Sequence, residues 1–280
     1  MNWEETILHI REDPEFEMLI TLAYMEEDLE LNVKRFQNSG EFKATLKLLE
    51  RYCPHAQKLI DLGCGNGTTS ASFALHGFDV IAVEPNPSLA VGAGAVRELK
   101  QKFSLENLKI VQDTAEELEL NPGEFDVVYC RQSLHHASDL LKFVANAARF
   151  LRPGGIFMTT RDHVVFDEKD KIWFLENHPL QKFYGGENAY SPEQYKTAFQ
   201  KAGLRVLLEL KYWDSIINFY PLTRYEISKR RYRFWFKTLF YPVWMIYNKV
   251  KQTPGKPNRR AGLDEKEIPG RMYSFLAIKD

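Results

Sequence analysis

Lys58-Leu-Ile-Asp-Leu-Gly-Cys-Gly-Asn-Gly67 is the stretch of sequence that decides the fold. Its apolar start predicts a buried strand, and its alternate glycines predict a loop that opens a helix from Thr68 to His76. Glycine lets the backbone approach a bound molecule that a Cβ would push away. Asp61, at the end of the strand, can accept a hydrogen bond from an ammonium group. A dinucleotide-binding fingerprint, G-x-G-x-x-G, would need its third glycine at Thr68 and is therefore disfavoured.

After this loop the chain alternates between further strands and helices. Such alternation predicts an α/β fold with a doubly wound, Rossmann-like and mainly parallel sheet. Helices are expected from Pro87 to Phe103, from Ser138 to Leu151 and from the capping box at Ser191 to Gly203. The expected strands after the first are Phe78–Val83, Leu108–Val111, Phe125–Cys130, Ile156–Thr160, Leu204–Leu210 and Met272–Ile278.

Three parts of the chain are distinguished by composition and pattern. Residues 1–57 are predicted to form a helical cap, with helices at Pro14–Leu31 and Glu41–Tyr52. Residues 58–210 and 271–280 are predicted to form the core. Residues 211–270 are an insertion between the last two strands. Within it, 223–251 holds eight Lys/Arg against one acid, a local charge of +7 that leaves −8 for the remainder. Its aromatic stripe either packs on the core or lies on an anionic membrane surface.

The overall composition is that of a globular protein: hydrophobic residues make up 44%, charged residues 27%, and the net charge is −1. No global attraction to nucleic acid is expected. Cys53, Cys64 and Cys130 have neither metal-ligand spacing nor a disulfide pattern, so we expect no bound metal and a location in the reducing cytoplasm. If residues 223–251 bind an anionic membrane, the protein would lie at the cytoplasmic membrane surface. The N-terminus lacks the apolar segment of a signal peptide, and no apolar run reaches the ~18 residues of a spanning helix.

Two more acids stand at the ends of predicted strands. Glu84, followed by Pro85 and Asn86, ends the second strand, where a carboxylate can take both ribose hydroxyls of a nucleoside. Asp113 follows the third strand and can accept the exocyclic amine of adenine. With Asp61 these acids provide one carboxylate at each of three strand ends, an arrangement suited to an adenosyl group with an amino-acid tail.

The motifs Phe125-Asp-Val-Val128, Leu134-His-His136 and Leu151-Arg-Pro-Gly-Gly155 follow in order. With them, residues 58–155 resemble the class I S-adenosylmethionine-dependent methyltransferases, in the small-molecule branch that includes the ubiquinone-pathway C-methyltransferases. The resemblance implies a seven-stranded sheet of order 3-2-1-4-5-7-6 with strand seven antiparallel, and S-adenosyl-L-methionine as cofactor. The cofactor-binding residues that it implies are Asp61, Gly63, Cys64, Gly65, Glu84, Pro85, Asp113, Thr114 and Arg131.

Candidate catalytic and substrate residues are fewer. Methyl transfer mainly requires alignment of the acceptor, and a general base matters only when the acceptor must lose a proton. His136 and His135, after strand four, either serve this purpose or shape the loop. Arg161 could meet an anionic substrate. Two further candidates are a helical latch whose Arg35 would pair with the methionyl carboxylate, and a lid at residues 182–190 whose Tyr184 and Tyr190 would line the acceptor pocket.

The sequence thus predicts a methyltransferase acting on a small or lipid-linked acceptor. One alternative is a nicotinamide-dependent oxidoreductase on the same architecture. Another is a non-catalytic adaptor that binds a membrane or a protein through its insertion, which the three ligand-facing acids disfavour. The sequence does not predict the oligomeric state.

Overall fold

A seven-stranded sheet forms the centre of the computed structural model, which describes residues 1–223, 225–229 and 270–280. Its strand order is β3-β2-β1-β4-β5-β7-β6, as the resemblance implies. β7 is antiparallel to both neighbours, whereas the other pairs are parallel. The strands are β1 (Lys58–Leu62), β2 (Asp79–Val83), β3 (Leu108–Val111), β4 (Phe125–Arg131), β5 (Leu151–His163), β6 (Leu204–Leu210) and β7 (Met272–Lys279).

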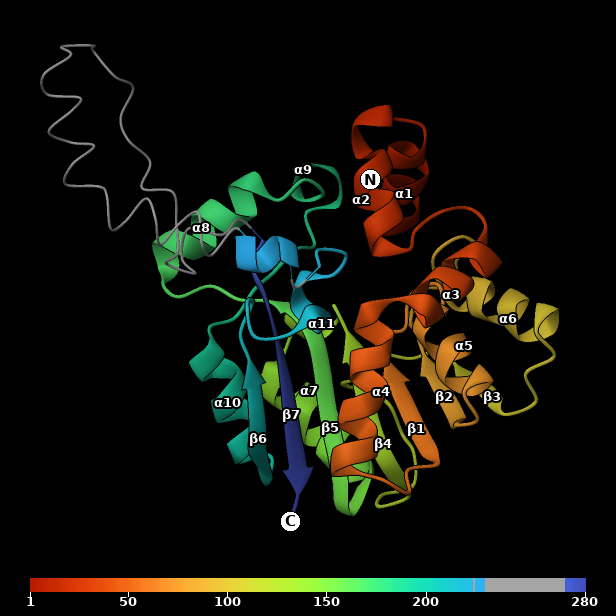
Figure 1. The fold of residues 1–280 in the computed structure, drawn as a ribbon, viewed down its shortest axis with the longest axis vertical. Coiled ribbons are helices and arrows are strands. Elements are labelled where there is room, and N and C mark those ends of the chain that lie inside the picture. The colour runs from red at the N-terminus through yellow and green to blue at the C-terminus, as the bar shows by residue number, and fades with distance from the viewer. Residues whose placement is uncertain (224, 230–269) are drawn as a thin grey trace, which may run out of the picture.

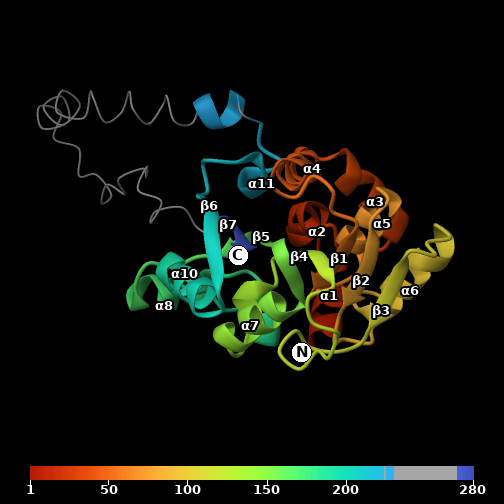
Figure 2. The same cartoon turned by 90° about the horizontal axis from the view of Figure 1, so that it is seen from below.

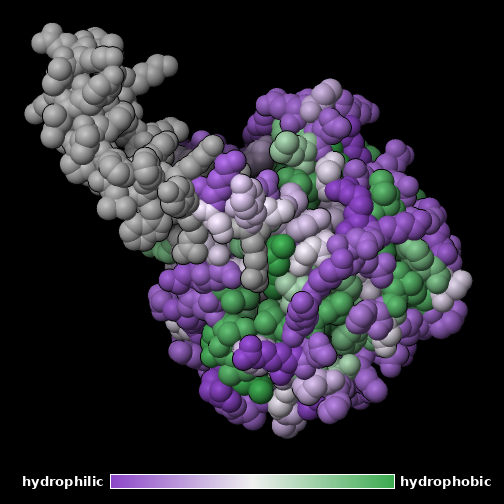
Figure 3. All heavy atoms as spheres, in the orientation of Figure 1, coloured by the Kyte–Doolittle hydropathy of each residue, from purple (hydrophilic) through white to green (hydrophobic). Residues whose placement is uncertain are grey.

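Helices cover both faces of the sheet. Figure 2 shows α4 (Gly40–Tyr52), α5 (Thr68–Leu75) and α11 (Ile216–Phe219) on one face, and α7 (Leu140–Phe150) and α10 (Pro192–Lys201) on the other. Apolar side chains at helical spacing on α4 pack against the first face: Phe42, Leu49 and Cys53 are buried, and Leu46 is partly buried. Figure 3 shows hydrophobic residues at the surface on this side of the molecule. Leu208 of β6 and Ile278 of β7 are partly buried and pack against the same apolar cluster as α4.

Several of the remaining helices gather at the end of the sheet to which the parallel strands point. In Figure 1, α1, α2, α8 and α9 all lie at this end, above the carboxyl ends of the strands. A parallel α/β sheet binds its ligands at this end. These helices and the other short elements are α1 (Trp3–Arg11), η1 (Pro14–Phe16), α2 (Glu17–Ala23), α3 (Leu29–Asn38), α6 (Ala93–Lys102), η2 (Leu134–His136), α8 (Glu168–Asn177) and α9 (Gln181–Tyr184).

Local capping explains several helix boundaries. α10 begins with the predicted capping box, in which Ser191 accepts from the backbone of Gln194 and the Gln194 side chain accepts in return from Ser191. The N-cap of α7 lies one residue later than predicted, at Asp139 instead of Ser138, and the helix begins at Leu140. The prediction of one long helix over residues 14–31 is wrong. The chain there forms η1, α2 and the start of α3, since Tyr24 takes a left-handed conformation (φ +58°) that ends α2.

The helix predicted to begin at Pro87 begins instead at Ala93. The Asn86 side chain accepts a hydrogen bond from the backbone of Ser88, and its carbonyl accepts from Ala93, so that residues 86–92 form a turn. Asn in this role competes with helix formation through its own local hydrogen bonds. The turn keeps the chain after β2 compact beside the end of that strand.

Most of the basic aromatic segment predicted at 223–251, including Trp235 and Trp244, lies outside the described residues. Its described start contains Ile227, which is buried, and Tyr225, which is exposed. Among the residues that the structure describes, no helix is long and apolar enough to cross a membrane. Packing on the core and attachment to a membrane both stay predictions.

Candidate active site

The glycine loop after β1 is packed on one side and open on the other. Gly63 (φ +66°) and Gly65 (φ +56°) both take the left-handed conformation that favours glycine. A Cβ on Gly63 would lie 2.7 Å from Cβ of Ser133, whose hydroxyl donates to the Leu62 carbonyl at 2.8 Å. A Cβ on Gly65 would meet nothing within 4 Å. The loop is therefore held against the chain after β4 and has room at Gly65 for a ligand.

Asp61 is fully buried at the start of this loop. Its Oδ2 accepts hydrogen bonds from the hydroxyls of Thr69 and Ser70, each at 2.6 Å. Its Oδ1 is buried and has no hydrogen-bond partner within the described part of the chain. Burial raises the pKa of Asp61 to about 6, despite the two hydroxyls that lower it. An unsatisfied buried carboxylate oxygen is costly, and a ligand's ammonium group would satisfy it.

Glu84 and Asp113 stand at the ends of β2 and β3, beside Asp61 at the end of β1. Oε2 of Glu84 accepts from the Gly65 amide at 2.8 Å, and Oε1 accepts from the Asn86 amide at 3.0 Å. Burial raises the pKa of Glu84. A carboxylate has about four acceptor sites, so two amides leave capacity for ribose hydroxyls. Asp113 is partly exposed and accepts from the Thr114 amide at 2.8 Å.

A cavity of about 50 Å³ lies against the glycine loop. The N-terminal helices border it: Tyr24 and Phe36 line the cavity, and the Asn66 side chain donates to the Tyr24 carbonyl at 2.7 Å. Arg131 lines the cavity from the end of β4 and pairs with the buried Glu41 of α4 at 2.6 and 3.2 Å. A cavity of this size fits a small polar group such as the amino-acid end of a ligand. Its lining includes Tyr24, Phe36, Gly63, Cys64, Thr69 and Arg131.

Two other predicted site residues have partners away from this cavity. Arg35 pairs with Glu26 and donates to the Thr21 carbonyl at 2.7 Å. Arg161 is buried; it donates to the carbonyls of Ile217 and Tyr220 at 3.1 and 3.0 Å and lies 3.6 Å from Glu41. The predicted contacts of Arg35 with a methionyl carboxylate and of Arg161 with a substrate stay predictions. Pro85 is exposed beside Glu84.

The two adjacent histidines have different environments. His135 is buried, and its Nδ1 lies 2.9 Å from Oδ1 of Asp162. Burial, together with the neighbouring histidine rings, holds the pKa of His135 well below its usual value. His136 is exposed, and its Nδ1 lies 3.1 Å from the Gly186 carbonyl. Of the two, His136 is therefore the one that an acceptor in the surrounding solvent reaches more readily.

The predicted lid at residues 182–190 packs close to these histidines and to the N-terminal helices. The Tyr184 hydroxyl donates to Glu187 at 2.7 Å, and the Tyr190 hydroxyl donates to the Ala137 carbonyl at 2.6 Å. The Tyr184 ring lies 4.9 Å from that of Trp3 in α1. Residues 182–190, predicted as a lid, and the N-terminal helices, predicted as a cap, thus pack against each other above the strand ends.

Sequence reasoning missed Asp162, Glu41 and His178 and gave no role to Glu187. Glu41 pairs with Arg131 and Arg161, which are distant in sequence, and Asp162 at the end of β5 contacts His135 in η2. No local pattern distinguishes these residues from ordinary acids. One usable signal was the number of histidines: four of the chain's seven lie in the short region from 135 to 178.

Comparison with known proteins agrees with this geometry. A family model described as a methyltransferase domain matches residues 28–209, well over half of the chain. The chain is 32% identical over 130 residues to an uncharacterized methyltransferase, YcgJ, of Bacillus subtilis, which covers 46% of this chain and 49% of that protein. It is 36% identical over 107 residues to a ubiquinone biosynthesis O-methyltransferase of Aliivibrio fischeri, and this match covers 37% of this chain and 44% of that protein. The chain spans about half the length of the curated relatives it matches.

Solved structures share the fold. The crystal structure of B. subtilis YcgJ superposes with a TM-score of 0.55 at 19% identity, covering 85% of this chain and 98% of that chain. A geranyl diphosphate methyltransferase in complex with S-adenosylmethionine gives a TM-score of 0.56 at 14% identity, covering 85% of each chain. Together with the family match, the sheet order and the acids around the glycine loop, these likenesses show that the chain belongs to the class I methyltransferases, whose cofactor is S-adenosylmethionine.

Proposed function

We propose that the protein transfers a methyl group from S-adenosylmethionine to a small or lipid-linked acceptor. The observation that carries the proposal is the buried Oδ1 of Asp61, which lacks a partner in the described structure beside a loop that is open at Gly65. In this proposal Asp61 meets the ammonium end of the cofactor, Glu84 the ribose and Asp113 the adenine. When bound, the cofactor supplies a methyl group that its sulfonium already activates.

The protein's own residues then position the acceptor and exclude water. The turn that carries His135 and His136 begins directly after Ser133, the residue packed against the glycine loop. The acceptor would lie beside this turn, on the side of the glycine loop that is open at Gly65 and beneath residues 182–190. His136 is exposed, and its Nδ1 lies 3.1 Å from the Gly186 carbonyl, so its Nε2 would take a proton from an acceptor that must lose one. His135 is held by Asp162 and would orient rather than deprotonate.

The acceptor class is supported by two kinds of observation. One relative is named for ubiquinone biosynthesis, and one structural neighbour is a geranyl diphosphate methyltransferase, so isoprenoid or quinone-like acceptors occur among similar proteins. The segment 223–251 carries a charge of +7 with several aromatic residues, a composition suited to an anionic membrane surface. A lipid-linked acceptor would be consistent with both.

Transfer of tritium from methyl-labelled S-adenosylmethionine tests the proposal. The purified protein is incubated with an aqueous extract and with a lipid extract of cells, and label is counted in products separated from the cofactor. We expect labelled product from one of the two extracts. The Glu84→Ala variant is the control, and at limiting cofactor it should transfer less label than the wild type. Absence of transfer to either extract, with S-adenosylhomocysteine failing to bind, would refute the proposal. Label in the lipid extract would select a lipid-linked acceptor.

A further inference from the structure

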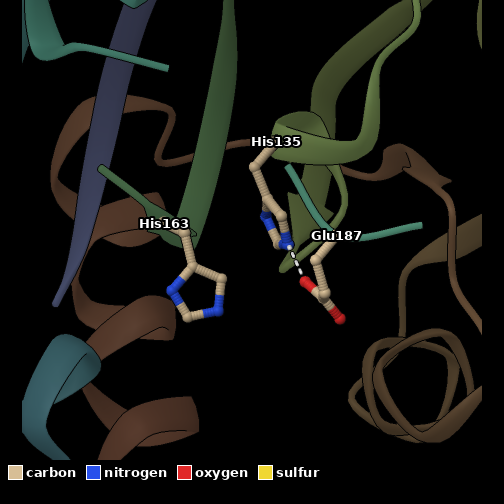
Figure 4. Close-up of side chains that lie close together, drawn as sticks. All are labelled: His135, His163 and Glu187. Carbon is tan, nitrogen blue, oxygen red and sulfur yellow. Dashed lines mark ion pairs between the residues drawn. The ribbon is translucent and has the colours of Figure 1, made fainter. Parts of the chain in front are cut away.

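Four histidines and a glutamate cluster beside the proposed acceptor site. The ring centroids of His135 and His163 are 4.9 Å apart, and those of His163 and His178 are 5.4 Å apart. The Glu187 side chain, only 5% exposed, reaches between His135 and His178. Figure 4 shows His135, His163 and Glu187 converging from three separate segments of the chain. The mechanism proposed above gives no role to His163, His178 or Glu187.

Three donor atoms of this cluster are spaced for a metal ion. One ring nitrogen from each of His135 and His163 and one carboxylate oxygen of Glu187 all lie within 4.8 Å of one another. Two donors on a common tetrahedral ion, each at ~2.1 Å, would be roughly 3.4 Å apart. The distance from Nε2 of His135 to Oε2 of Glu187 is already 3.9 Å, so small side-chain rotations would complete the site.

The surroundings of His135 match those of a metal-bound histidine. Asp162, fully buried, accepts from the His135 backbone amide at 3.0 Å and lies 2.9 Å from its Nδ1. A metal-ligating histidine almost always donates its second ring N–H to such a carboxylate, which fixes the tautomer and orients the ring. With the proton on Nδ1, the lone pair of Nε2 faces the carboxylate of Glu187. At 3.9 Å the two atoms are too far apart for a hydrogen bond, and a cation between them would satisfy both.

The other two donors also have suitable environments. Glu187 is oriented by the Tyr184 hydroxyl at 2.7 Å, and its Oε1 lies 3.5 Å from Nδ1 of His178. His163 is buried, and in Figure 4 one of its two ring nitrogens lies on the side of the ring that faces His135 and Glu187.

We propose that His135, His163 and Glu187 bind a divalent transition-metal ion, with Asp162 and Tyr184 as positioning residues. Two imidazoles and one carboxylate are donors that zinc and ferrous iron accept, whereas magnesium and calcium prefer oxygen alone. Three protein ligands leave at least one coordination position open. An oxygen atom of the methyl acceptor would occupy it, so the ion would orient that oxygen and favour its deprotonated form, and His136 would take the proton.

This use in catalysis rests on the proposed function, whereas metal binding itself does not. The two are separated by measuring them on the same samples. Untagged full-length protein is stripped with a chelator and titrated with Co²⁺, followed by visible absorption, and its affinity for S-adenosylhomocysteine is measured in parallel. We expect one Co²⁺ per chain, and Zn²⁺ should displace it. Metal analysis of the protein as purified then identifies the ion that it carries.

Variants locate the site. His163→Ala and the conservative Glu187→Gln should each weaken Co²⁺ binding by roughly tenfold or more, and Asp162→Asn by about 10–100-fold, as for other residues that orient ligands. His55→Ala, which removes an exposed histidine remote in sequence, should leave Co²⁺ binding unchanged. Retained binding of S-adenosylhomocysteine shows that each variant is folded.

Two results would overturn the metal site. In the first, the wild-type protein binds neither Co²⁺ nor Zn²⁺ in a fixed ratio of ion to chain. In the second, a folded Glu187→Gln or His163→Ala variant binds Co²⁺ as tightly as the wild type. If the wild type binds Co²⁺ but not S-adenosylhomocysteine, the metal site stands and the proposed methyl transfer fails. If it binds both, but the variants transfer methyl groups normally, the ion binds without serving the acceptor.

Discussion

Replacing Asp61 with asparagine should make the ligand-free protein more stable while weakening its affinity for the cofactor. Burial raises the pKa of Asp61 from 3.8 in the unfolded chain to about 6 in the native state. An acid whose native pKa is raised destabilises the fold progressively as pH rises from below the unfolded pKa through the native pKa. With about two pKa units at 1.36 kcal/mol each, the ionised carboxylate costs ~3 kcal/mol above pH 7.

The uncharged amide of Asp61→Asn removes this cost and can still bond the hydroxyls of Thr69 and Ser70. We therefore expect the free energy of unfolding in urea to rise by up to ~3 kcal/mol at pH 7.5. At pH 4, close to the unfolded pKa, the gain should fall to ~0.6 kcal/mol. Asp79→Asn, at an exposed carboxylate on the next strand, is the matched control and should change little at either pH.

Binding of S-adenosylhomocysteine should change in the opposite direction. The ammonium of the ligand loses a charged partner, and charge-assisted hydrogen bonds contribute about 1.5–3 kcal/mol each, so the affinity should fall about tenfold or more. Stabilisation of the apo protein with loss of affinity is the expected pattern for a residue kept for ligand binding. A variant that is no more stable at pH 7.5, or one that binds the ligand as tightly as wild type, would refute this role of Asp61.

Three further predictions concern single residues. Glu84→Ala should weaken S-adenosylhomocysteine binding about tenfold or more in calorimetry, because the ribose loses its acceptors; unchanged affinity in the folded variant would contradict the assignment. His136→Ala should leave this affinity intact and lower kcat by ~10²–10⁴ if the residue is the base, and a change below about threefold would make it structural. Glu41→Gln should destabilise the protein by about 3–5 kcal/mol in urea unfolding, because Arg131 keeps a buried charge without its partner. Glu30→Gln, at an exposed ion pair, should cost under about 1 kcal/mol.

Most of the sheet could be predicted from the sequence because its elements carry local signals. The apolar run into the glycine loop, the capping box at Ser191 and the alternation of strands and helices each depend on a few neighbouring residues. The strand order came from the resemblance to a family, since local pattern does not specify which strands pair. The error at Asn86 has a local cause: Asn-Pro reads equally well as a helix start and as a turn, and here the side-chain hydrogen bond to Ser88 selects the turn.

The site was predictable in part. Asp61, Glu84 and Asp113 could be found because parallel strands bring their carboxyl ends to one edge. The cluster of His135, His163 and Glu187 could not, because it joins a turn, the end of β5 and a loop that meet only through packing. Glutamate and histidine at those positions look in sequence like ordinary polar residues.

Isothermal titration calorimetry of the wild-type protein with S-adenosylhomocysteine, and separately with NAD⁺ and NADP⁺, tests the central assignment most directly. We expect S-adenosylhomocysteine to bind at one site per chain and neither nicotinamide cofactor to give measurable heat. Competition by S-adenosylmethionine should abolish the signal. Binding of a nicotinamide cofactor together with absence of S-adenosylhomocysteine binding would contradict the assignment of the glycine loop and its three acids.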